Sequence, residues 1–180
     1  VQAVKRVERV VPETVEKLFA DMIGVEDIKE EIGALYQHLK VNHNQIDRIA
    51  VPFNFVISGQ VGSGKTKLAY IITELLYEAG ISKRREPLEI SAVSLMESMQ
   101  EVLEDAPPVV IINNAEYLWS PAPQPEKGGE DKNQIWLLLE QLLEDACLGQ
   151  GHFYLFLGEM SAMDSLISNN SKIKNYVTYL

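Results

Sequence analysis

Short apolar runs in this chain alternate with longer segments in which hydrophobic residues recur at helical spacing. The short runs are rich in β-branched and aromatic residues, which is typical of strands buried on both faces of a parallel sheet. The predicted strands are FNFVIS, LEIS, VVIIN, FYLFLG and, at the end of the chain, YVTYL.

The longer segments predict helices between these strands. Apolar residues recur at helical spacing from Val25 to Lys40, and the segment KTKLAYIITELLYEA is helical up to Gly80. Further helices are predicted from a capping box formed by Ser94 and Glu97 toward Asp105, from about Asn133 to Cys147, and near Met160 to Ile167. Strands that alternate with helices predict a three-layer α/β domain with a mostly parallel five-stranded sheet and a ligand site at the carboxyl ends of its strands.

Composition narrows the possible partners. The chain has 180 residues, of which 46% are hydrophobic and 23% charged, and this balance is typical of one globular domain. Its net charge of −10 opposes binding to a nucleic-acid backbone. Its apolar runs are far shorter than the roughly 18 residues that a membrane span needs. We therefore expect neither nucleic acid nor membrane as a partner.

The beginning of the sequence, VQAVKRVERVVPET, has no initiator methionine and no apolar block typical of a signal peptide. Together with the single cysteine, Cys147, this favours a segment of a longer, cytoplasmic protein. We expect residues 1–20 to be an extension and residues 21–180 to be the folded core. The Pro- and Gly-rich stretch from Ser120 to Asp131 is the best candidate for a mobile loop.

A glycine-rich stretch between the first predicted strand and the next helix carries the clearest chemistry. It matches the pattern G-x4-G-K-[ST], in which backbone N–H groups and a helix amino terminus surround a phosphate. Lys65 would bridge the β- and γ-phosphates of ATP, and Thr66 would offer its hydroxyl to Mg²⁺. The residues predicted to bind ATP or ADP here are Gly59, Gln60, Val61, Gly62, Ser63, Gly64, Lys65, Thr66 and Lys67.

The second element of such sites is degenerate. In phosphate-loop NTPases a strand ends in an Asp that holds Mg²⁺ through water, and many add a Glu that polarises the attacking water. Here the strand VVII ends in Asn113 and Asn114, which carry no charge, and we expect Asn113 to contact the metal through water. Loss of a general base commonly costs roughly 10²- to 10⁴-fold in rate. Glu116 and Glu159 are the nearby acids that could substitute.

With these motifs, nearly the whole chain resembles an AAA+ ATPase domain of the CbxX/CfxQ (SpoVK-like) branch. FADMIGVEDIKEEI is similar to the segment in which residues matching Met22, Ile23 and Gly24 border the adenine. NNAEYL is similar to the family's D-E-A-x-x-L, and FYLFLGEMSAM resembles the strand that ends in the sensor-1 region. The resemblance implies a P-loop NTPase fold, ATP and Mg²⁺ as ligands, and assembly with protein partners. It also implies that residues 21–180 are the AAA+ nucleotide-binding core without its lid subdomain.

The sequence departs from that family at several functional positions. NNSKIKNY resembles the family's N-P-G-L-x-S-R-F, but Asn175 stands at the arginine-finger position. The chain between Leu95 and Val109 is too short for the family's pore loop. The sequence also ends at Leu180, before the segment that would match the family's helical lid. These departures predict a domain that binds nucleotide but hydrolyses it slowly or not at all.

Three functions therefore stay open. The first is a regulatory or assembly module in a homo-oligomeric ring or beside an active AAA+ paralogue or domain. The second is a working ATPase that remodels a protein client and uses an unconventional acid. The third is an interaction scaffold whose phosphate loop binds no nucleotide.

Overall fold

The five predicted apolar runs form one sheet in which every neighbouring pair of strands is parallel. The structure, a computed structural model, describes residues 11–42, 54–97, 99–118, 132–147, 152–169 and 173–180. The strands are β1 (Asn54–Ser58), β2 (Leu88–Ser91), β3 (Val109–Asn113), β4 (Phe153–Gly158) and β5 (Val177–Tyr179), in the order β2-β3-β4-β1-β5. This all-parallel arrangement confirms the predicted α/β fold class and is compatible with a P-loop NTPase core.

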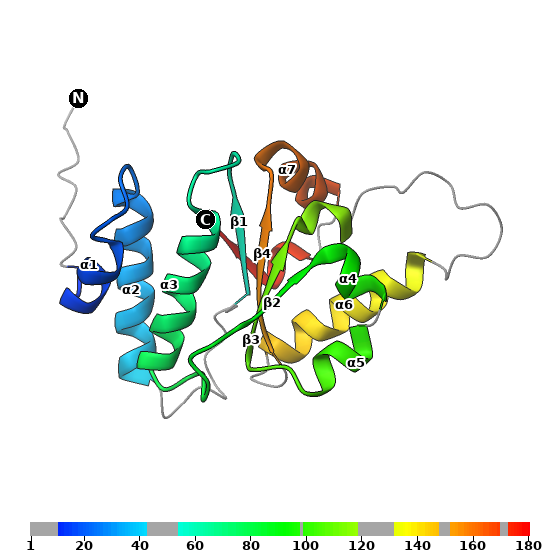
Figure 1. Cartoon of the computed structure of the whole chain (residues 1–180), viewed down its shortest axis with the longest axis horizontal. Helices are drawn as coiled ribbons and strands as arrows, with labels where there is room; N and C mark the ends of the chain where they lie inside the picture. Colours follow the sequence, from blue (N-terminus) through cyan, green and yellow to red (C-terminus); the bar gives the residue numbers. More distant parts are fainter. Residues whose placement is uncertain (1–10, 43–53, 98, 119–131, 148–151, 170–172) are drawn as a thin grey trace.

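Helices cover both faces of the sheet, as parallel strands require. Figure 1 shows α2 and α3 on one side and α4 and α6 on the other. The helices are α1 (Glu13–Phe19), α2 (Glu26–Asn42), α3 (Lys65–Glu78), α4 (Ala92–Glu97), α5 (Met99–Glu104), α6 (Lys132–Cys147) and α7 (Met160–Asn169), with the 3-10 turns η2 (Ala115–Leu118) and η3 (Ile173–Asn175). Within the described ranges, no helix is both long and apolar enough to cross a bilayer.

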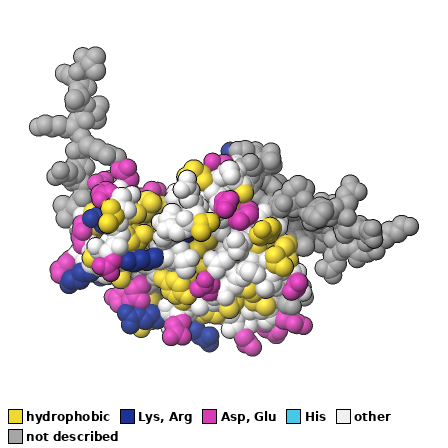
Figure 2. All heavy atoms as spheres, turned by 45° about the horizontal axis from the view of Figure 1, so that its top comes forward, with side chains coloured by type: hydrophobic (Ala, Val, Ile, Leu, Met, Phe, Trp, Pro, Cys, Tyr) yellow, Lys and Arg dark blue, Asp and Glu magenta, His cyan; other side chains and the backbone are white. Residues whose placement is uncertain are grey.

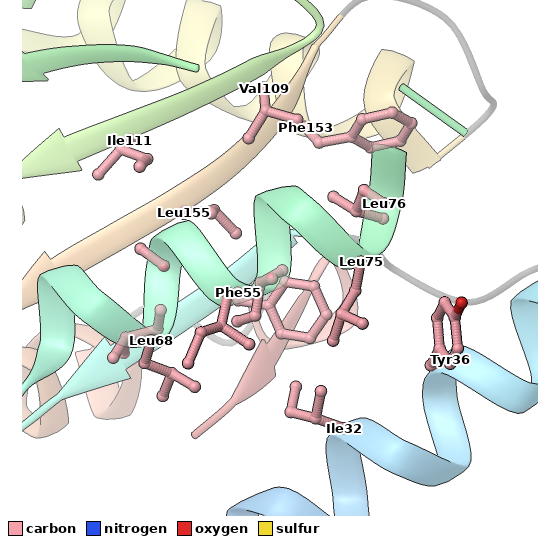
Figure 3. Packing of buried hydrophobic residues seen from close by; sticks show 14 of the residues in the cluster. Ile32, Tyr36, Phe55, Leu68, Leu75, Leu76, Val109, Ile111, Phe153 and Leu155 are labelled. Atoms are coloured by element: carbon pink, nitrogen blue, oxygen red, sulfur yellow. The ribbon is translucent and has the colours of Figure 1, made fainter. Parts of the chain in front are cut away.

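The alternation of side chains along each strand creates two hydrophobic cores. In β3 and β4, Ile111 and Leu155 belong to the core that contains α1, α2 and α3. Their neighbours Val110 and Phe156 belong to the core that contains α4 and α6. Figure 3 shows the first core, in which Phe55 of β1 lies among side chains from α2 and α3. The sheet is thus the middle layer of three.

Helix α1 packs on the first core although it lies in the segment predicted as an extension. Val15 and Phe19 are 0% and 3% exposed, and both belong to the core that contains α2 and α3. Gly33 of α2 allows this close approach, because a Cβ there would lie 3.2 Å from Pro12. Residues 11–19 therefore contribute apolar burial to the same folded unit as the sheet.

One predicted helix start is wrong. The helix after β2 begins at Ala92, because the hydroxyl of Ser91 accepts a hydrogen bond from the backbone N–H of Ser94 at 3.1 Å. Ser91 is therefore the N-cap, and the expected capping box of Ser94 and Glu97 does not start this helix. The predicted mobile loop from Ser120 to Asp131 lies outside the described residues.

Candidate nucleotide-binding site

The glycine loop connects the end of β1 to the beginning of α3 at the carboxyl edge of the sheet (Figure 1). Gly62 and Gly64 have φ of 80° and 90°, a backbone conformation that favours glycine. The backbone N–H of Ser63 donates to the carbonyl oxygen of Gln60 at 3.2 Å, which closes the turn. The glycines of the motif are thus required by the path of the backbone.

Lys65 folds back across this loop. Its Nζ donates to the carbonyl oxygens of Gly59 and Gln60, each at 2.8 Å. A Cβ on Gly59 would lie 2.7 Å from Ser63 Oγ, so the Ser63 hydroxyl would have to turn away to admit a side chain there. The two carbonyl oxygens are neutral, so an anionic phosphate is a stronger partner for the ammonium group. The ammonium group of Lys65 therefore lies against the glycine loop, and its role in binding a phosphate stays a prediction.

The amino terminus of α3 is open to an anion. The helix has no acidic residue in its first turn. Its N-cap is Gly64, which has no side chain to accept a hydrogen bond from the first-turn N–H groups. The N–H groups of a first helical turn have no partner within the helix, and the helix dipole favours negative charge there. The side chain of Thr66 is exposed at this end. These donors and this hydroxyl fit a phosphate group and its magnesium ion.

The segment predicted to border the adenine lies next to the loop. A Cβ on Gly64 would be 3.2 Å from Met22 Cε, so the Met22 side chain touches the loop. Ile23 is 97% exposed, and Gly24 has a φ of 73°. Lys67 of α3 forms an exposed ion pair with Asp21 at 3.8 Å. A role of these residues in binding the base stays a prediction.

At the end of β3, the Asn113 side chain takes part in a short network. Its Nδ2 donates to Glu89 Oε1 at 2.7 Å, and the hydroxyl of Tyr70 donates to Glu89 Oε2, also at 2.7 Å. This hydrogen bond to Glu89, followed by burial and the charge of Glu89, raises the pKa of Tyr70. The network therefore joins α3, β2 and β3 at the edge that carries the phosphate loop.

Neither Glu89 nor Tyr70 was expected from the sequence. The available signal was the helical spacing, because Tyr70 follows Thr66 by four residues and so lies on the same face of α3. Glu89 also stands out as a charged residue within the apolar run LEIS. What decides its role is the pairing of β2 with β3, which aligns Ser91 with Asn113 and Glu89 with Ile111.

Asn114 has a backbone role that the sequence analysis did not foresee. Its φ is 54°, in the left-handed region, and its carbonyl oxygen accepts a hydrogen bond from the backbone N–H of Tyr117 at 3.0 Å. Asn adopts this conformation more readily than most residues. The change from strand β3 to the turn η2 therefore favours Asn at this position.

The two acids proposed as substitutes lie in different surroundings. Glu116 Oε2 is buried and has no hydrogen-bond partner among the described residues. A Cβ built on Gly158 would come within 2.7 Å of that oxygen, so Glu116 lies against the end of β4. Glu159 is exposed, and its carbonyl oxygen accepts from the Met163 N–H at 2.9 Å. Asn175, at the predicted arginine-finger position, is exposed in η3.

Charge on the face that carries this edge is mixed. Figure 2 brings the edge toward the viewer, and the described Lys and Arg side chains lie in separate small groups among acidic ones. This view shows no continuous basic surface over the described residues of that face.

Comparison with known proteins gives one weak sequence similarity. No family model matches the chain. The chain is 27% identical over 140 residues to the ATP-dependent zinc metalloprotease FTSH 9, chloroplastic/mitochondrial, of Oryza sativa subsp. japonica. The match covers 74% of this chain but 18% of that protein, so the chain spans less than a fifth of this relative. With the parallel sheet and the glycine loop before α3, this similarity fits a P-loop AAA+ fold at the level of overall architecture.

Proposed function

We propose that the chain is an AAA+ domain of the CbxX/CfxQ branch that binds ATP or ADP with Mg²⁺ and hydrolyses ATP slowly or not at all. It acts as a regulatory or assembly module in a homo-oligomeric ring or beside an active AAA+ partner, in the cytoplasm. The observation that carries the proposal is a complete phosphate loop, with Lys65 Nζ held at 2.8 Å from Gly59 O, on the same edge as Asn113.

Binding follows from groups that this chain supplies. Lys65 exchanges neutral carbonyl partners for phosphate oxygens, and the first-turn amides of α3 point to the same anion. Thr66 offers a hydroxyl ligand, and Asn113 reaches the metal through water. Magnesium, when bound, supplies positive charge that offsets the charge of the phosphates.

Hydrolysis is weakened because neither side chain at the end of β3 can accept a proton. Asn113 and Asn114 are neutral amides, and Asn175 provides no cation for a neighbouring γ-phosphate. The missing base alone corresponds to a loss of roughly 10²- to 10⁴-fold. The protease activity named for the rice relative is not part of this proposal, because the match covers 18% of that protein.

A second candidate function is favoured by one specific contact. Glu116 has a buried, unpartnered carboxylate oxygen against Gly158, whose carbonyl accepts the N–H of Gly59 at the start of the loop. A carboxylate so close to the loop could activate water in a working ATPase that remodels a protein client. Glu159 is the weaker choice, since its side chain is exposed.

Calorimetric titration with ATP and ADP, with and without Mg²⁺, tests the proposal. We expect saturable binding to the unaltered chain and none to Lys65→Ala. Lys17→Ala is the matched control, because Lys17 is an exposed lysine of α1 whose side chain is 73% accessible. No binding by the unaltered chain, with folding intact by circular dichroism, would overturn the proposal in favour of a nucleotide-free scaffold.

Phosphate release from the same samples separates the two candidates. The proposed module releases no phosphate above the level of Lys65→Ala. Release that depends on Lys65 and is lost in Glu116→Gln would instead establish the working ATPase. Glu159→Gln is the control for that variant, because it removes an equivalent charge from the exposed acid near the same strand end.

A further inference from the structure

The orientation of the Asn113 amide is fixed by its partner. A carboxylate oxygen only accepts hydrogen bonds, so the group that faces Glu89 Oε1 at 2.7 Å must be the Asn113 nitrogen. The carbonyl oxygen Oδ1 is then the free end of the amide, and no hydrogen bond to it occurs among the described residues. A free carbonyl oxygen is an acceptor, as the carboxylate of a conventional metal-holding Asp is.

Glu89 is itself held in place by α3. Tyr70 donates to Glu89 Oε2 at 2.7 Å, and Tyr70 lies one helical turn after Thr66 on the same face of α3. The Glu89 carboxylate therefore connects α3, which carries the Thr66 hydroxyl expected to ligate Mg²⁺, with the end of β3, which carries Asn113. Both side chains of this connection are accessible, since Glu89 is exposed and Tyr70 is 44% exposed.

We propose that Glu89 is a positioning residue for the magnesium side of the nucleotide site. It turns the Asn113 amide so that Oδ1, and not the N–H₂ group, is presented to water bound by the metal. The inference rests on the proposed function and deepens it, because it assigns to Glu89 of β2 the negative charge that β3 lacks. Glu89 acts through Asn113 and does not itself touch the nucleotide.

The same contact explains why an acid at residue 113 is incompatible with Glu89. Asn113→Asp would place two carboxylates 2.7 Å apart, and like charges at this distance cannot both ionise without a large penalty. The double variant Glu89→Gln with Asn113→Asp exchanges the two chemical groups. The amide at residue 89 then donates to the carboxylate at residue 113. The exchanged pair also returns the negative charge to β3.

The experiment measures how much Mg²⁺ strengthens the binding of a fluorescent ADP analogue. Each protein is titrated in Mg²⁺ and in EDTA, and binding of Mn²⁺ to the ADP complex is followed by electron paramagnetic resonance. The variants are Glu89→Gln, Asn113→Asp and the double exchange. Glu74→Gln is the matched control, because Glu74 of α3 is likewise a glutamate that accepts a hydrogen bond from a neighbouring side chain, Arg85 Nε at 2.7 Å, and not from Asn113.

We expect Glu89→Gln to reduce the Mg²⁺ enhancement and the Mn²⁺ affinity by about 10- to 100-fold, the usual effect of losing a group that orients a metal ligand. The affinity in EDTA stays unchanged, which a general loss of structure would not allow. The double exchange restores the enhancement to at least that of the unaltered chain, and Glu74→Gln leaves it unchanged.

Two failures are distinguishable. If the unaltered chain binds ADP in neither buffer, the proposed function fails. If ADP binds but Glu89→Gln keeps the full Mg²⁺ enhancement, the role of Glu89 is refuted while the proposed function stands. If Glu89→Gln does not fold, the double exchange decides: an Mg²⁺ enhancement below that of the unaltered chain also refutes the positioning role.

Discussion

The backbone N–H of Gly59 donates to the carbonyl oxygen of Gly158 at 3.3 Å, which joins the first residue of the phosphate loop to the last residue of β4. Gly158 is buried, and the side chains of Glu116 and Met163 occupy the space where its Cβ would be. Any displacement of Gly158 therefore reaches the loop directly.

Gly158→Ala is expected to destabilise the domain by about 1–3 kcal/mol, the usual cost of overpacking. The added Cβ would lie 2.5 Å from Met163 Sδ and 2.7 Å from its Cγ, so Met163 must move. Urea unfolding measures the loss of free energy. In a Met163→Ala background the same substitution should cost less, and an equal cost in both backgrounds would show that Met163 is not the obstacle.

Asn54→Ala should also destabilise the domain, through unpaired buried groups. Asn54 is 0% exposed; its Nδ2 donates to the Tyr176 carbonyl at 3.2 Å, and its Oδ1 accepts from the Tyr154 N–H at 2.9 Å. Leaving a buried donor or acceptor unsatisfied costs about 1–3 kcal/mol. Urea unfolding tests this against Asn175→Ala, because Asn175 is an exposed Asn of η3. Similar losses for both variants would show that the buried hydrogen bonds of Asn54 do not stabilise the domain.

Asn114→Ala is expected to lower the free energy of unfolding by about 1–2 kcal/mol, because the left-handed conformation is costly for residues other than Gly and Asn. Asn114→Gly keeps the conformation accessible and should be tolerated better. Thermal unfolding of the two variants gives the comparison. If the Ala variant were as stable as the Gly variant, the φ of 54° would not be constraining this residue. Asn114→Glu would meet the same backbone cost.

Alkaline pH should destabilise the domain partly through Tyr179. Burial, followed by the charge of Asp164, raises the pKa of Tyr179 to about 12 from its ordinary 10.0. Since the folded pKa is the higher one, this contribution to stability is present below pH 10 and is lost as pH rises to about 12. Urea unfolding across this window should show a smaller decrease for Tyr179→Phe than for the unaltered chain, and equal decreases would exclude Tyr179 as a cause.

The strands were predictable because their physical signal is local. Val109–Asn113 and Phe153–Gly158 are continuous apolar runs, and a strand buried on both faces needs such a run. The start of α4 could not be predicted from local sequence, since Ser91 and Ser94 are both good N-cap residues. The choice between them depends on packing, because the earlier start buries Ala92 and Leu95 against the second core.

The phosphate loop was equally local, since its glycines, Lys65 and Thr66 are consecutive. The hydrogen-bond partner of Asn113 could not be predicted locally, because the identity of that partner depends on which strand lies next to β3 and in which register the two strands pair. Asn114 shows a third case. Its residue type was interpreted as the loss of an acid, while its backbone conformation gives an independent reason for Asn at this turn.

Strand β1, which leads into the phosphate loop, is held by contacts with residues far along the chain. Asn54 of β1 contacts Tyr154 of β4 and Tyr176, the residue before β5, across separations of 100 and 122 residues, whereas β2 and β3 pair across a short segment. Contacts between distant residues require closing long loops, which slows folding. We therefore expect the glycine loop to gain its final support late. If the proposed function holds, nucleotide binding then reports assembly of the whole sheet and not only the pairing of β2 with β3.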